Sequence, residues 1–180
     1  MRQQDQTDIA STPIVMNSEE LNIEFMSVKD AAYRYAASLL HDYLEAEDIV
    51  QDLYEKLWRR RLLLHKSRFR SLVITSIRNM CLDALRRRER LRQTIVATPT
   101  ETISSNEEES NTELTSLIEH IISQLPDRER EVMHLRDCEQ MEFEDIASIV
   151  GITESAARMA LSRARQKVRD DLSKVMSYGL

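Results

Sequence analysis

Apolar residues recur every three or four positions over several stretches of the chain, which is the spacing of one face of an α-helix. This spacing predicts helices over residues 28–43, 45–61, 68–90 and 114–124. Leu125-Pro126 ends the last of these, and acidic residues in a first turn favour a further helix from Asp127. Residues 93–113 lose the pattern and are rich in Thr, Ser, Asn and Glu, which is typical of a flexible linker.

The pattern therefore predicts an all-α protein with two small helical domains. We expect a flexible N-terminal arm over residues 1–27, with room for a short helix near residues 19–26. The first domain is expected over residues 28–92, a flexible acidic linker over 93–113 and the second domain over 114–180. Such a linker permits many relative placements of the two domains.

The stretch from Phe143 to Arg169 has the pattern of a helix-turn-helix. A short apolar helix ends at Gly151, and glycine tolerates the positive φ that a helix end often needs. Thr153 can cap the next helix, with Glu154 in its first turn. That helix carries five bases and no acid from Ser155 to Arg169. A basic helix after such a turn fits the major groove of DNA, although a helical hairpin with a solvated basic face would look similar.

The composition supports a helical protein. The 180 residues include two Gly and three Pro, and 42% of them are hydrophobic. No apolar run approaches the roughly 20 residues of a membrane span, and the first residues lack the basic start and apolar core of a signal peptide. We therefore expect a cytoplasmic protein, with Cys81 and Cys138 as reduced core residues.

The net charge of −6 is distributed unevenly along the chain. Residues 1–27 and 93–113 are acidic, whereas residues 28–92 hold fifteen bases and nine acids. Nine of those bases lie between Lys66 and Arg92, against two acids. A local basic surface of this density favours phosphate binding, even in a protein whose average charge is negative.

Two predicted helices carry polar rows opposite their apolar stripes. The row on helix 45–61 contains Asp48, Gln51, Asp52 and Glu55, and it is either a solvated face or a docking surface for a basic partner. The row on helix 68–90 leads through Thr75, Asn79 and Asp83 into the basic cluster. Asn and Thr can hydrogen-bond base edges, so this second row favours a role in DNA binding over simple solvation.

Catalytic signatures are missing from the sequence. The doublet His41-Asp42 occurs in metal phosphohydrolases, but no further His and Asp follow it at useful spacing. The phosphate-binding, dinucleotide-binding, zinc-protease and serine-hydrolase motifs are absent. The sequence therefore predicts no enzyme, no catalytic residue, no metal and no cofactor.

Four motifs in series resemble one protein family. They read AEDIVQDLYEKLW, FRSLVITSIRNMCLDALRRR, LPDREREVMHLR and the helix-turn-helix ending LSRARQKVR. In their order and spacing the chain resembles a bacterial RNA polymerase sigma factor of the sigma-70 family, extracytoplasmic-function group, over about residues 28–172. The first domain would then be region 2 and the second domain region 4.

The resemblance implies partners and site residues. Region 2 would dock on the coiled coil of the polymerase largest subunit through Asp48, Gln51, Asp52 and Glu55. It would bind the −10 promoter element through Lys66, Arg78, Asn79, Asp83, Arg86 and Arg87, with a flipped base held by residues 61–67. Region 4 would contact the flap of the second-largest subunit and read the −35 element through Ser155, Arg158, Met159, Ser162, Arg163, Arg165 and Lys167. The linker would run toward the RNA exit path, and an anti-sigma factor would act in trans. Leu72 stands where the family often has an aromatic residue.

Two other functions remain open at this point. A stand-alone helix-turn-helix regulator would use its N-terminal helical domain for dimerisation or ligand binding. A metal phosphohydrolase would be built on His41-Asp42 and the carboxylates that follow, and a chelator would abolish its turnover.

Overall fold

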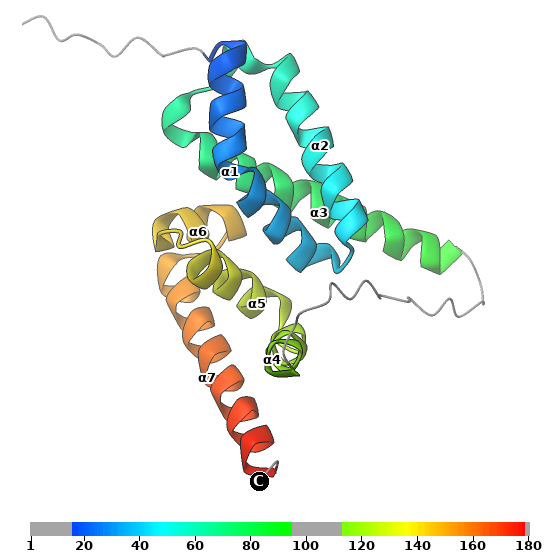
Figure 1. The fold of residues 1–180 in the computed structure, drawn as a ribbon, viewed down its shortest axis with the longest axis vertical. Coiled ribbons are helices and arrows are strands. Elements are labelled where there is room, and N and C mark those ends of the chain that lie inside the picture. The colour runs from blue at the N-terminus through cyan, green and yellow to red at the C-terminus, as the bar shows by residue number, and fades with distance from the viewer. Residues whose placement is uncertain (1–15, 95–112, 179–180) are drawn as a thin grey trace, which may run out of the picture.

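The computed structural model describes residues 16–94 and 113–178, and all regular structure in these ranges is helical (Figure 1). The first domain holds α1 (Ser18–Leu40), α2 (Tyr43–Arg59), two 3₁₀ turns, η1 (Arg61–Leu63) and η2 (Lys66–Arg68), and α3 (Phe69–Thr94). The second domain holds α4 (Glu113–Ser123), α5 (Asp127–Met133), the π-helical turn η3 (His134–Cys138), α6 (Phe143–Val150) and α7 (Glu154–Tyr178). The prediction of an all-α protein is confirmed. Most of the predicted linker, with its proposed path toward the RNA exit, lies outside the described residues.

Helix α1 begins well before the position predicted for it, so residues 18–27 are not part of a flexible arm. The Asn17 side chain accepts a hydrogen bond from the Glu20 backbone N–H, and the Glu20 carboxylate accepts one from the Asn17 N–H, both at 2.9 Å. This capping box satisfies two N–H groups that would otherwise lack partners. Leu21 and Phe25 are buried, because they extend the helical spacing of the core positions that begin with Val28.

The doublet His41-Asp42 forms the joint between α1 and α2. His41 ends α1 in the left-handed conformation, with φ of 52°. Asp42 caps α2, where its carboxylate accepts from the Glu45 N–H at 3.0 Å and pairs with Arg88 of α3 at 3.0 Å. The hydrogen bond from the Glu45 backbone, aided by Arg88, lowers the pKa of Asp42. The two residues thus have a structural role, as the end of α1 and the cap of α2, that requires no catalytic function.

The three consecutive leucines after α2 have different environments. Leu64 is buried beneath the segment, whereas Leu62 and Leu63 are 63% and 77% exposed. Phe69 is buried where α3 begins. Burial of one leucine in three explains why the segment fits no single amphipathic helix.

The two cysteines differ in a way that the sequence did not predict. Cys81 is buried in α3, and burial raises the pKa of its thiol to about 12. Cys138 is exposed at the end of η3, so the prediction that both cysteines are core residues was wrong for Cys138.

Helices α6 and α7 form the predicted helix-turn-helix. Gly151 ends α6 with φ of 75°, and its N–H donates to the Ala147 carbonyl at 2.9 Å. Thr153 caps α7, because its hydroxyl accepts from the Ala156 N–H at 3.2 Å. Ala147 is buried close to the turn, where a larger side chain would hold the two helices apart.

A substitution at Gly151 tests this turn. No atom lies within 4 Å of the position of an added Cβ, so the cost of Gly151→Ala comes from the backbone conformation alone. We expect a loss of about 1–2 kcal/mol in the free energy of unfolding, measured by urea denaturation. Gly151→Asn is the matched control and should cost less, since Asn adopts the left-handed conformation more readily. Equal losses for the two variants would contradict this explanation.

The two domains pack against each other, although the linker left their relative placement open. Helix α6 lies against α3, and η3 lies against α1 (Figure 1). One cluster of buried apolar side chains runs from α1, α2 and α3 into α5, η3, α6 and α7. The seam between the domains therefore contains both a shared apolar core and the polar contacts described below.

Candidate nucleic-acid interface and domain seam

Helix α7 presents an exposed face that contains all seven residues predicted to contact a −35 element. Its opposite face is buried through Ala157, Ala160, Leu161 and Ala164, which pack on the rest of the second domain. The exposed residues are Ser155, Arg158, Met159, Ser162, Arg163, Arg165 and Lys167. An exposed helix after a tight turn, with small residues on its packed side, can enter a major groove.

Arg158 is held in place at the start of this face. Its guanidinium lies 4.2 Å from the centre of the Phe143 ring and pairs with Glu154 at 3.1 Å. Arg136 lies 5.0 Å from the same ring centre. The ring therefore positions two guanidinium groups through cation–π contacts at the entrance to α7.

Arg165 and Lys167 lie toward the edges of the face. Arg165 forms an ion pair with Asp137, and this hydrogen bond raises the pKa of its guanidinium. Lys167 pairs with Asp171 at 2.9 Å. Arg163, in contrast, has no intramolecular polar contact within the described residues, so it is the base most readily available to a ligand.

Gln166 belongs to the same face, and the sequence prediction missed it. It is exposed, and its side-chain amide donates to Asp170 at 2.8 Å. Its spacing of four residues from Ser162 and eleven from Ser155 is helical, and this spacing would have identified it.

Most residues predicted to contact a −10 element are exposed on the first domain. Asn79, Asp83, Arg86 and Arg87 are exposed on α3, with Arg86 paired to Asp83 at 3.0 Å. Lys66 is also exposed, and it pairs with Glu24 of α1 at 2.7 Å.

Arg78 does not join this exposed group. Its guanidinium pairs with Glu131 of the second domain at 2.5 Å, and only 20% of its side chain is exposed. In the structure Arg78 is therefore a contact between the domains. The sequence could not indicate this, because the partner lies 53 residues away in the chain.

The residues predicted to dock on polymerase form one row on α2. Asp48, Gln51, Asp52 and Glu55 are all exposed, opposite the buried Ala46, Ile49, Val50, Leu53 and Leu57. Only Glu55 has an ion-pair partner in the described residues, Arg59 at 3.3 Å. The three acids of this row are therefore exposed and available to a partner.

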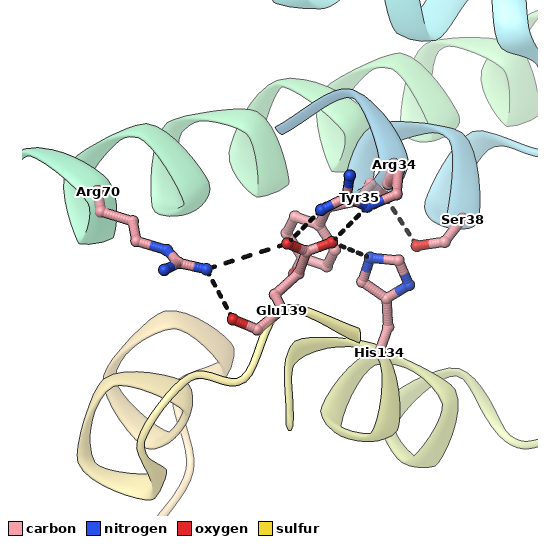
Figure 2. A network of polar contacts seen from close by, with 6 residues as sticks. All are labelled: Arg34, Tyr35, Ser38, Arg70, His134 and Glu139. Carbon is pink, nitrogen blue, oxygen red and sulfur yellow. Dashed lines mark hydrogen bonds and ion pairs between the residues drawn. The ribbon is translucent and has the colours of Figure 1, made fainter. Parts of the chain in front are cut away.

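Within the described residues, five charged residues form the ion pairs of the interdomain seam: Arg34, Arg70, Arg78, Glu131 and Glu139. Figure 2 shows the half centred on Glu139, whose carboxylate accepts two hydrogen bonds from Arg34, at 3.0 and 2.9 Å. Arg70 donates to the Glu139 backbone carbonyl at 2.6 Å. The second half is centred on Glu131, which also accepts from the Tyr35 hydroxyl at 2.5 Å. Burial and Glu131 raise the pKa of Tyr35, so Tyr35 remains a donor.

His134 lies inside this seam, stacked on the Tyr35 ring at 5.6 Å between centres. Its Nε2 is 3.5 Å from the Glu139 carboxylate and has no hydrogen-bond partner. Burial, with a smaller effect from Arg34, lowers the pKa of His134, although Glu139 opposes the shift. Neutral His134 is therefore the form that the closed seam favours.

Acid is expected to destabilise the folded chain through His134. As the pH falls below 6.5, the unfolded chain binds a proton at this histidine before the folded chain does. The free energy of unfolding should fall by at most about 1.4 kcal/mol per pH unit in that range. Urea denaturation at a series of pH values measures the effect. His134→Gln should flatten the curve below pH 6.5, and His120→Gln, at an exposed position, should not.

Two further observations concern membrane and metal binding. Within the described residues, none of the helices combines the length and apolar character required to cross a bilayer. In the same part of the chain, no three His, Cys, Asp or Glu side chains gather where they could hold a metal ion. Among the described residues, therefore, His41 and Asp42 belong to no such group.

The geometry defines a protein of two helical domains, the second carrying a helix-turn-helix. Residues 25–91 match the family model of sigma-70 region 2, and residues 115–168 match that of sigma-70 region 4. Together the two models account for about two thirds of the chain. The chain belongs to the sigma-70 family of RNA polymerase sigma factors, and its pair of regions is that of the extracytoplasmic-function group.

Two curated relatives are similar to this chain in sequence. The chain is 26% identical to the "ECF RNA polymerase sigma factor SigE" of Mycolicibacterium smegmatis over 150 residues, covering 81% of the chain. It is 30% identical to the "Probable RNA polymerase sigma factor RfaY" of Xanthomonas campestris pv. campestris over 147 residues, covering 76% of the chain. The matches span 58% and 36% of the lengths of those two relatives.

Solved structures show the same fold. The sigma factor RpoE of Bartonella quintana, solved in complex with the anti-sigma factor NepR, has a TM-score of 0.74 and 24% identity, with 86% of this chain and 98% of that chain covered. CnrH, solved in complex with the cytosolic domain of CnrY, has a TM-score of 0.62 and 20% identity, with 88% and 90% covered.

Proposed function

We propose that this protein is a dissociable sigma factor that directs promoter-specific transcription initiation by RNA polymerase. The observation that carries the proposal is the occurrence of region 2 and region 4 in series, each with its partner-facing residues exposed. A stand-alone regulator would use its first domain for dimerisation or ligand binding. It would have no use for a first domain with an acidic row on α2 and a polar and basic row on α3.

Region 2 supplies polymerase binding and strand opening in this proposal. The row Asp48, Gln51, Asp52 and Glu55 docks on the coiled coil of the largest subunit. The −10 element is bound by Lys66, Asn79, Asp83, Arg86 and Arg87, and the segment over residues 61–67 holds a flipped base. Unstacking a base costs a few kcal/mol, which contacts in the pocket and phosphate neutralisation offset. Leu72, exposed on α3, offers no aromatic ring for stacking there.

Region 4 positions the enzyme on duplex DNA. The exposed face of α7, with Gln166 added to the predicted residues, reads the −35 element, and region 4 contacts the flap of the second-largest subunit. Ala156, Met159 and the serines offer few polar groups to bases, so contacts with phosphates and DNA shape carry much of the binding.

The protein acts in the cytoplasm in this proposal, without catalytic activity of its own. An anti-sigma factor acts on it in trans. The similar structures of RpoE and CnrH support this partner, because each was solved with a protein bound to it, named an anti-sigma factor in the case of RpoE.

Run-off transcription tests the proposed function. Purified core polymerase and genomic DNA are incubated with and without the protein, and the transcript start sites are mapped. We expect discrete new start sites that share two sequence elements, and a monomeric protein that co-elutes with core polymerase. A dimer that binds a palindrome and has no affinity for polymerase would support the stand-alone regulator instead.

Substitution of Arg163 tests the assignment of the α7 face. Arg163→Ala should weaken promoter binding by about 1–3 kcal/mol if its guanidinium holds a guanine in bidentate fashion. Binding of holoenzyme to a matched promoter is measured by fluorescence anisotropy, with Ser173→Ala on the distal part of α7 as control. Transcription and binding at the wild-type level would remove Arg163 from the site.

A further inference from the structure

Three arginines of region 2 lie at the seam, and in the closed chain all three contact region 4. Arg34 comes from α1, and Arg70 and Arg78 come from α3. Arg34 holds Glu139 in a bidentate pair, and Arg70 lies 4.0 Å from the Glu139 carboxylate (Figure 2). Arg78 holds Glu131 at 2.5 and 3.4 Å. Two carboxylates of one domain thus neutralise a cationic surface of the other.

Beside these arginines, further basic and polar residues of region 2 face acidic residues of region 4. A hollow between the domains is lined by Arg68, Arg70 and Ser71 of region 2 and by Glu144 and Asp145 of α6. Ser71 donates to the Asp145 carboxylate at 3.2 Å. Region 4 therefore presents four acids to this surface, although its α7 presents bases on another face.

Region 2 places Asp30 near Arg34, where its charge helps to raise the pKa of Arg34, but the two form no ion pair within the described residues. Within the described residues, every ion pair formed by Arg34, Arg70 or Arg78 is with region 4. Separation of the domains would leave Arg34, Arg70 and Arg78 without their ion-pair partners. A guanidinium that accepts a carboxylate in bidentate geometry presents the same fork of donors to a phosphate.

We propose that Arg34, Arg70 and Arg78 form a phosphate-binding surface of region 2, which Glu131 and Glu139 of region 4 occupy in the closed chain and which the DNA backbone occupies when the regions separate. The ligand is the sugar–phosphate backbone of DNA, read without regard to sequence. The proposal rests on the proposed function for the identity of its ligand. It adds that free protein binds DNA weakly because its own carboxylates occupy the site.

The test uses Glu139→Gln in the full-length protein, because glutamine keeps the shape of the buried side chain and removes its charge. The probe is a fluorescent duplex of non-promoter sequence, and binding is followed by anisotropy at several salt concentrations. Small-angle X-ray scattering reports whether the domains separate. We expect a larger radius of gyration, about tenfold tighter binding, and a salt dependence of log K steeper by about 1–3, since each neutralised phosphate contributes about 0.9.

Two further variants make the result specific. Asp127→Asn removes one charge from an exposed position of region 4, outside the seam, and should leave both measurements near wild type. Arg34→Gln removes the cation of the same ion pair. It should therefore increase the radius of gyration, but it should not raise the affinity for DNA, because one of the proposed phosphate-binding arginines is lost. It also serves as the second test if Glu139→Gln does not fold, which circular dichroism reveals.

Two outcomes would overturn the proposal. One is an equal gain in duplex affinity for Asp127→Asn, because net charge alone would then explain the effect. The other is domain separation in Glu139→Gln without tighter binding. Both are independent of polymerase and of promoter sequence, so they are distinguishable from a failure of the proposed function in run-off transcription.

Discussion

The variant Asp48→Arg/Asp52→Arg is expected to lose binding to core polymerase by ~100-fold or more, because like charges placed against a basic partner cost several kcal/mol. Both side chains are exposed on α2, one turn apart, and neither forms an ion pair within the described residues. Reversing their charges should therefore leave the helices intact. Co-elution with core polymerase on a sizing column measures binding, and circular dichroism measures helical content.

A matched variant separates the docking row from a general effect of charge. Glu89→Arg/Asp127→Arg changes the net charge by the same amount at two exposed positions away from α2. It should co-elute with polymerase like the wild type. Normal co-elution of Asp48→Arg/Asp52→Arg would refute the assignment of this row.

The variant Arg78→Ala is expected to lose about 3 kcal/mol in the free energy of unfolding, because it leaves the Glu131 carboxylate buried without its cation. Glu131 is 7% exposed and, among the described residues, would retain only the Tyr35 hydroxyl as a side-chain donor. Urea denaturation followed by circular dichroism measures the loss. A role of Arg78 in −10 binding alone would instead predict unchanged stability with weaker promoter binding.

A double variant tests whether the unpaired charge of Glu131 causes the loss in the free energy of unfolding. Arg78→Ala/Glu131→Gln removes the charge that Arg78→Ala leaves unpaired, so it should recover part of the stability. Arg86→Ala serves as the control, because its ion pair with Asp83 is exposed and contributes little. A loss for Arg86→Ala as large as that for Arg78→Ala would contradict the structural role of Arg78.

Local rules predicted the helices and the helix-turn-helix. Apolar spacing identified α2 and α3 to within one to four residues at each end, and Gly151 with Thr153 placed the turn. The capping box at Asn17 was also readable in the sequence, since Asn precedes Glu by three residues there. The start of α1 was missed because the acidic composition of the first 27 residues outweighed that signal.

Long-range contacts could not be predicted from the same rules. Glu131 and Glu139 are ordinary charged residues in a helical pattern, and their burial depends on arginines more than fifty positions away. The docking row and the α7 face were predictable because exposure on a helix follows from local periodicity. The contact of Arg78 with Glu131 was not predicted, because a basic cluster in sequence does not indicate which of its members faces another domain.

The spacing of acids along α7 sets a limit on the DNA that this helix can contact. Asp170 lies shortly beyond Lys167, and its negative charge opposes phosphate contacts further along the helix. From Ser155 to Lys167 the helix rises about 18 Å, at 1.5 Å per residue. This length corresponds to about five base pairs at 3.4 Å each. Promoters that depend on this protein should therefore share an upstream block no longer than about half a turn of duplex.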